Sequence, residues 1–280
     1  MAVHAARLRV EPRRHLRQTA EAASTVIIGG FKLRWKGVVA MGGLLFNVTT
    51  AALMMLMING GLALVGRGTL RGRGIPWAAV ALTAVALAGV ITQLCWSGAM
   101  DALDSDPARS GWWRILTATF MQNGGLLGGA WNIATLAVIA ALADWFWGAP
   151  LTLGLFLAGI LLPGRIDALF GESGHSTDPR NFAGSSGATY FLAATLSAAL
   201  LLRRLRAARD PENVKQTLLA AAVPALGLVV WFAQSNGHGL VSVYGFALGA
   251  AVCALTRRTA DGPAPAADAA TGGQVPPGTV

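Results

Sequence analysis

The amino-acid sequence predicts an all-α polytopic membrane protein, with a core of six spanning helices and an extra hydrophobic segment before the core. Two observations lead to this prediction. Hydrophobic residues make up 54% of the 280 residues and charged residues only 12%, whereas a soluble domain has about 25% charged residues. The apolar residues also form long runs separated by short basic clusters, which is typical of proteins that cross a membrane several times. These features exclude a soluble globular domain.

Seven apolar runs are long enough to span a bilayer, which requires about 20 residues of helix. They cover residues 38–65, 76–97, 124–147, 150–170, 183–202, 217–234 and 238–256. Composition divides the chain into a basic segment 1–36, an extra hydrophobic segment with its basic loop 37–75, a membrane core 76–258 and a disordered tail 259–280. The tail is rich in Ala, Gly and Pro and has no apolar period, so it is expected to lack a packed structure.

The formal net charge of +9 raises the question of a nucleic-acid partner. Lys and Arg lie in short clusters beside apolar runs, so we expect the lipid bilayer as partner and no nucleic acid. The two cysteines, Cys95 and Cys253, lie in separate apolar runs without other ligand types nearby. Neither a disulfide framework nor a zinc site is therefore expected.

The basic clusters also predict the orientation, because Lys and Arg in short loops favour the cytoplasmic side. Segments 66–75 and 203–215 and the pair Arg257–Arg258 are basic. The loops between them should face outward, so both ends of the six-helix core are expected in the cytoplasm.

The first apolar run, 38–65, does not fit this orientation, because one extra span would place the basic N-terminus outside. Three interpretations are open. The run crosses in the disfavoured direction, it is not a simple span, or translation starts downstream, for example at Met41.

The segment 181–190 contains a serine between glycines, Gly184-Ser185-Ser186-Gly187, followed by Tyr190. Glycines permit close backbone approach, and N–H groups at a helix start can stabilise an oxyanion. Ser186 is therefore a candidate nucleophile. A motif for packing between membrane helices is the alternative.

His238 opens the last apolar run and is the candidate base, because an ionisable residue within a membrane span indicates function by default. Measured from the basic residues Arg203 and Arg257, Ser186 and His238 lie at similar depths, about 26–28 Å at 1.5 Å per helical residue. Close packing of the two helices would bring the two side chains within hydrogen-bond distance.

A stripe of small residues supports this packing. Ser242, Gly245 and Gly249 lie on the same helical face as His238. Tyr190 lies one turn below Ser186 and could pack on the imidazole. Another candidate base is His175, which lies with Asp178 in the loop 171–182.

These residues resemble the rhomboid intramembrane serine proteases over about residues 76–258. The matching features are Gly184–Gly187 with Tyr190, His238 with Gly245, Trp113–Arg114, Asn132 and Arg209–Pro211. The resemblance implies a six-helix rhomboid core with a Ser186–His238 dyad, and Asn132 with the Ser186 backbone N–H as oxyanion donors. Gly184, Gly187, Tyr190 and Gly245 would support the dyad.

The resemblance further implies single-pass or otherwise membrane-anchored protein substrates, no metal or organic cofactor, and a place in the bacterial cell membrane with the active site toward the outer face. The chain departs from the family in a short first outer loop, in Val241 where a glycine usually follows the histidine by three residues, and at one oxyanion position. A histidine oxyanion residue usually precedes the asparagine by one turn, and this position is Gly128 here. Gln122 or Asn123 are the candidate substitutes.

Two other functions remain open at this stage. A rhomboid-like protein with weak or no catalytic activity could bind membrane clients without cleaving them. A small transporter or channel would need ionisable residues along a path through the membrane, and the six core runs contain few.

The predicted orientation can be tested with reporter fusions. A reporter that is active only outside the cytoplasm should be inactive when fused after Arg258 and active when inserted near Ser105. The opposite pattern would place Ser186 at the cytoplasmic side of the membrane.

Overall fold

The computed structural model describes residues 29–66, 68, 72–106, 109–169, 183–207 and 210–256, with the side chains of 29–42 and 168 left undescribed. All regular structure in these ranges is helical, which confirms the all-α prediction. The chain forms two compact units, Met1–Val48 and Thr49–Val280. The predicted disordered tail 259–280 lies outside the described residues.

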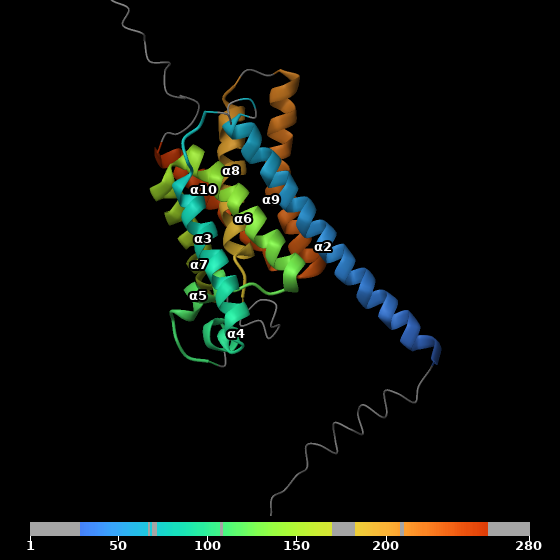
Figure 1. Ribbon diagram of the computed structural model, residues 1–280. Helices are drawn as coiled ribbons and strands as arrows, with labels where there is room; N and C mark the ends of the chain where they lie inside the picture. The colour runs from blue at the N-terminus through green and yellow to red at the C-terminus, as the bar shows by residue number, and fades with distance from the viewer. Residues whose placement is uncertain are drawn as a thin grey trace, which may run out of the picture. The chain divides into compact units, whose positions relative to one another are not determined.

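Figure 1 shows the helices in their order along the chain. They are α2 (Gly29–Val65), α3 (Trp77–Cys95), α4 (Ala99–Leu103), α5 (Arg114–Phe120), α6 (Gly125–Trp147), α7 (Ala149–Leu169), α8 (Ser186–Leu205), α9 (Pro211–Gln234) and α10 (Gly237–Thr256). Seven helices in the described part of the chain are long and apolar enough to cross a membrane, all except α4 and α5. The protein is therefore an integral membrane protein, and each predicted apolar run corresponds to one of these helices.

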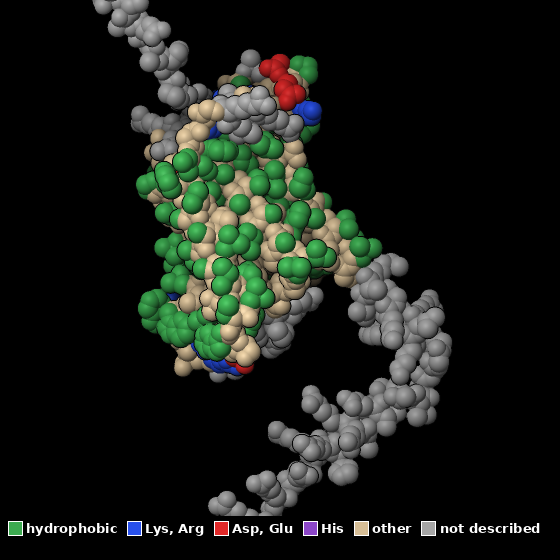
Figure 2. Space-filling model, in the orientation of Figure 1, with side chains coloured by type: hydrophobic (Ala, Val, Ile, Leu, Met, Phe, Trp, Pro, Cys, Tyr) green, Lys and Arg blue, Asp and Glu red, His purple; other side chains and the backbone are tan. Residues whose placement is uncertain are grey.

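The surface of the helices also suits a bilayer. Figure 2 shows hydrophobic side chains over the middle of the visible face, with Lys, Arg, Asp and Glu at its upper and lower ends. Large apolar side chains are exposed on several helices, such as Leu87, Leu161 and Val229. In water such exposure would be unfavourable, whereas lipid tails are as apolar as these side chains.

Two features of the chain were not predicted from apolar runs. Helix α9 begins at Pro211, before the predicted run 217–234, because the Asp210 side chain accepts a hydrogen bond from the Asn213 N–H at 2.7 Å and caps the helix. The expected outer loop 98–123 contains the short helices α4 and α5. Neither is long enough to produce a spanning run.

Helix α8 is the centre of the bundle. It packs against α6, α7, α9 and α10, and every residue from 188 to 200 is buried. Its mean hydropathy of 1.2 is the lowest among the seven long apolar helices described. Because α8 is surrounded by protein and not by lipid, it can carry Thr195 and Ser197 within its buried part.

Helices α8 and α10 approach each other through glycine. A Cβ atom at Gly245 would overlap the carbonyl oxygen of Phe191 and lie 2.8 Å from its Cα. A Cβ at Gly249 would lie 2.8 Å from the Thr195 carbonyl oxygen. Gly245 and Gly249 of the predicted stripe thus lie at the contact, and Ser242 on the same face is fully buried.

The extra helix α2 is part of the same core from Thr49 onward. Leu53, Met54 and Met57 are fully buried. Near the other end of α2, the Arg203 guanidinium donates to the Leu64 carbonyl at 3.1 Å. The boundary between the two units, after Val48, thus lies inside the predicted extra segment 37–75.

The α8–α10 contact predicts a contrast between two glycines. Gly245→Ala should lower the free energy of unfolding by about 1–3 kcal/mol, because the added methyl group overpacks the contact; Gly245→Leu should cost more. At Gly154 a Cβ would meet nothing within 4 Å, so Gly154→Ala should be neutral or stabilise the helix by up to about 1 kcal/mol. Thermal unfolding in detergent measures both. Equal stability of the two variants would contradict the proposed contact.

Candidate active site

Ser186 is the first residue of α8, and the segment before it is fixed by Gly184. Gly184 has a φ of 131°, a conformation that residues with a Cβ rarely adopt. Its N–H donates to the Ala118 carbonyl at the end of α5 at 2.9 Å. A Cβ at Gly184 would lie 3.6 Å from Ser186 Oγ and 3.8 Å from Asn132 Nδ2. Glycine therefore permits the turn and leaves space between these two side chains.

His238 lies in the first turn of α10 and contacts Ser186. Its Nε2 is 3.0 Å from Ser186 Oγ, so the predicted contact between the two side chains is present. The distance is that of a hydrogen bond. The two residues come from different helices, and the glycine contact between α8 and α10 brings them together.

Asn236 determines which nitrogen of His238 carries the proton. Its Oδ1 accepts from the backbone N–H of His238 at 3.1 Å and lies 2.9 Å from His238 Nδ1. An amide oxygen can only accept hydrogen bonds, so Nδ1 carries the proton and Nε2 is free to accept the proton of Ser186 Oγ. Asn236 is only 1% exposed, which keeps the amide in one place.

Tyr190 packs on the imidazole, as the helical spacing predicted. The ring centroids of Tyr190 and His238 are 4.7 Å apart, with an angle of 60° between the planes. The Tyr190 hydroxyl donates to the Thr50 carbonyl at 2.6 Å. The imidazole is thus held by an aromatic face as well as by Asn236.

The neighbours of Ser186 in the motif differ in their surroundings. Ser185 is fully buried, and its Oγ lies 3.5 Å from Gln122 Nε2. Ser185 therefore contacts Gln122, whereas Ser186 contacts His238. A Cβ at Gly187 would meet nothing within 4 Å. A positive φ therefore explains Gly184 and close backbone approach explains Gly245, whereas neither applies to Gly187.

Asn132, the predicted oxyanion residue, lies on α6 beside Gln122. Its Nδ2 donates to Gln122 Oε1 at 3.0 Å. Gln122 is itself held by Gln93 of α3, with Gln122 N–H donating to Gln93 Oε1 at 2.9 Å and Gln93 Nε2 donating to the Gln122 carbonyl at 3.0 Å. Of the two candidate substitutes for the missing histidine at Gly128, Gln122 therefore contacts the oxyanion asparagine. The Asn123 side chain instead accepts from the Gly124 N–H.

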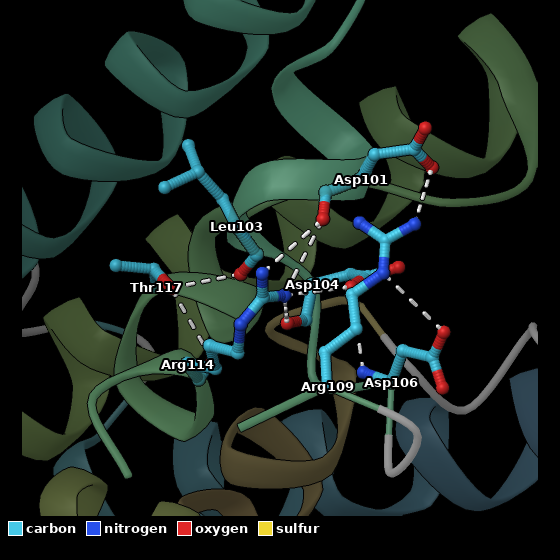
Figure 3. A network of polar contacts seen from close by, with 7 residues as sticks. All are labelled: Asp101, Leu103, Asp104, Asp106, Arg109, Arg114 and Thr117. Atoms are coloured by element: carbon cyan, nitrogen blue, oxygen red, sulfur yellow. Dashed lines mark hydrogen bonds and ion pairs between the residues drawn. The ribbon is translucent and has the colours of Figure 1, made fainter. Parts of the chain in front are cut away.

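Arg114 is the first residue of α5 and connects this helix to the segment before it (Figure 3). The Arg114 guanidinium donates to the Asp104 carbonyl at 2.8 Å and forms an ion pair with its carboxylate at 3.2 Å. Thr117 adds a hydrogen bond to the Leu103 carbonyl at 2.8 Å. These contacts fix α5, whose Ala118 carbonyl holds Gly184.

Sequence patterns did not point to Asn236, Gln93 or Thr50. For Asn236 a signal exists, because Asn is favoured at helix N-caps and stands two residues before the histidine. Gln93 and Thr50 are single polar residues within apolar runs, and nothing local shows which helix they contact. The other candidate base, His175, and its neighbour Asp178 lie outside the described residues.

The described residues contain no group of three or more His, Cys, Asp and Glu side chains that could hold a metal ion. The arrangement that is present is a serine hydroxyl, an imidazole whose Nε2 lies 3.0 Å from the serine oxygen, and an amide near the serine. This combination can carry out nucleophilic acyl transfer.

No family model, curated protein or solved structure matches this chain.

The contacts of Arg114 predict that substitutions of two arginines differ in their effect on stability. Arg114→Gln should destabilise the protein by about 2 kcal/mol, because hydrogen bonds to a largely buried charge are lost. Arg109 pairs with Asp101 and Asp106 at 3.4 and 3.6 Å and is 37% exposed, so Arg109→Gln should cost less than about 1 kcal/mol. Chemical or thermal unfolding compares them. Equal losses would show that the Arg114 network does not hold α5.

Proposed function

We propose that this protein is a rhomboid-like intramembrane serine protease, which cleaves single-pass or other membrane-anchored proteins in or near their transmembrane segment. The observation that supports this most strongly is the 3.0 Å distance between Ser186 Oγ and His238 Nε2. A serine hydroxyl is a weak nucleophile at its ordinary pKa and requires an adjacent base.

In the proposed reaction, Ser186 Oγ attacks the carbonyl carbon of the scissile peptide while His238 Nε2 takes its proton. The imidazolium then gives this proton to the leaving amine, and an acyl-enzyme remains on Ser186. Water repeats the sequence and releases the acid product. Asn236 keeps the imidazole in the required tautomer, in the role that the third residue has in serine-protease triads.

Two donors are proposed for the oxyanion of the tetrahedral intermediate. The Ser186 N–H belongs to the first residue of α8 and has no acceptor within the helix. Asn132 Nδ2 lies across the space beside Gly184. Its bond to Gln122 orients the amide, and the second amide hydrogen is the one proposed to reach the oxyanion.

The position of the site supports a substrate in the membrane. Ser186 and His238 both lie in first turns of helices that are apolar enough to span a bilayer. A substrate anchored in the same bilayer would present its chain at this depth. With the orientation predicted from the basic loops, the site would face the outer side of a bacterial cell membrane.

The other candidate function is binding of membrane clients without cleavage. One observation favours it: Gly128 supplies no donor side chain, and the donor nitrogen of Gln122, Nε2, lies 3.5 Å from Ser185 Oγ. A loss of one oxyanion donor costs about 10²–10³ in rate. Activity measurements decide between weak catalysis and none.

The dyad predicts a specific pattern of activity loss. Ser186→Ala and His238→Ala should each abolish cleavage of a model single-pass substrate nearly as completely as the double variant, because the two residues act as a unit. Asn132→Ala should lower kcat by about 10²–10³. Labelling by a fluorophosphonate probe should be lost in Ser186→Ala.

Ser185→Ala and His175→Ala are the controls, and both should keep activity. Cleavage retained in Ser186→Ala but lost in Ser185→Ala would overturn the nucleophile assignment. Loss in His175→Ala with retention in His238→Ala would move the base to the loop. An unmodified protein that neither cleaves nor labels would favour client binding.

A further inference from the structure

The extra helix α2 contacts both side chains that hold His238. The contact point is Thr50. Its Oγ1 accepts from Asn236 Nδ2 at 2.8 Å, and its carbonyl accepts from the Tyr190 hydroxyl at 2.6 Å. Asn236 and Tyr190 in turn contact the imidazole, at 2.9 Å from Nδ1 and with the rings 4.7 Å apart. One residue of α2 therefore binds both side chains that contact His238.

The amide of Asn236 depends on this contact for its orientation. Its oxygen side faces the N–H and Nδ1 of His238, and its nitrogen side faces Thr50. Because Asn236 is buried, leaving a polar atom of this amide without a partner costs about 1–3 kcal/mol. Removing the Thr50 hydroxyl would take away the acceptor of Nδ2, so the amide would be held less firmly with Oδ1 against Nδ1.

Helix α2 is anchored well enough to hold Thr50 in place. Leu53, Met54 and Met57 are fully buried one and two turns after it. At the distant end of the helix, Arg73 Nη2 donates to the Val65 carbonyl at 2.9 Å. The helix is fixed along its length from Thr49 and can act as a rigid support.

We propose that Thr50 is a positioning residue for His238, so that the active site is completed by the extra helix and not by the six predicted core helices alone. The proposal rests on the proposed function of the dyad. Thr50 does not touch the reacting atoms. It sets the orientation of Asn236, and Asn236 sets the tautomer of the base.

The test uses three variants of the full chain. Thr50→Val replaces the hydroxyl with a methyl group of the same size and leaves the backbone carbonyl that binds Tyr190. Thr50→Ser keeps the hydroxyl. Thr49→Val is the matched control, because Thr49 Oγ1 donates to Gln234 Oε1 at 3.0 Å, whereas Thr50 Oγ1 accepts from Asn236 Nδ2.

For the cleavage of a model single-pass substrate, Thr50→Val should lower kcat by about 10- to 100-fold with little change in KM, as a small misplacement of a catalytic group does. Thr50→Ser should retain most of the activity, and Thr49→Val should stay within about twofold of the parent. A merely structural role would lower the amount of folded protein in both valine variants and would leave kcat per folded molecule unchanged.

A second measurement does not depend on activity. Side-chain nitrogen NMR shifts distinguish the two tautomers of a neutral histidine, and His238→Gln identifies the signal. The parent and Thr49→Val should show the proton on Nδ1, and Thr50→Val should show an increased fraction with the proton on Nε2.

The outcomes separate the two proposals. If the parent cleaves but Thr50→Val and Thr49→Val have equal kcat and equal tautomer fractions, the role of Thr50 is overturned while the dyad stands. If the parent neither cleaves nor labels, the protease proposal fails, and the tautomer measurement still decides whether Thr50 orients His238.

Discussion

The contact between α8 and α10 is the constraint on which the site depends. The two helices carry the nucleophile and the base, and Gly245 lets their backbones approach until a Cβ would collide with Phe191. In a membrane, helices gain little from the hydrophobic effect, so close packing and hydrogen bonds must hold them together. The 3.0 Å contact between Ser186 and His238 follows from this packing.

Polar side chains inside the bundle form a second set of connections. Gln93 fixes the backbone of Gln122, and Gln122 receives the amide of Asn132. On the other side of the dyad, Asn236 joins His238 to Thr50. Each of these groups would be costly in an apolar interior without a partner, so the bonds that satisfy them also set their orientation. Stability and alignment of the site thus have the same physical origin.

The sequence-based expectations and the structure differ most for the extra helix α2. Its basic N-terminal flank conflicts with the orientation expected from the charge rule, and the sequence left three interpretations open. In the structure, its residues from Thr49 onward pack in the same unit as the other long helices, and Leu53, Met54 and Met57 are fully buried.

The sequence by itself determined the class of the protein and the approximate position of every long helix, and it predicted the contact between Ser186 and His238. These followed because a spanning helix has a fixed length, and because small residues at helical spacing mark a contact face. Tertiary structure decided the partners of isolated polar residues. Asn236, Gln122 and Thr50 obtain their roles from helices distant in the chain, and no local pattern encodes which of several packed helices a single amide or hydroxyl will meet. The same reason separates Gly245 from Gly187, because the sequence does not show that the backbone of Phe191 lies against Gly245 while a Cβ at Gly187 would meet nothing within 4 Å.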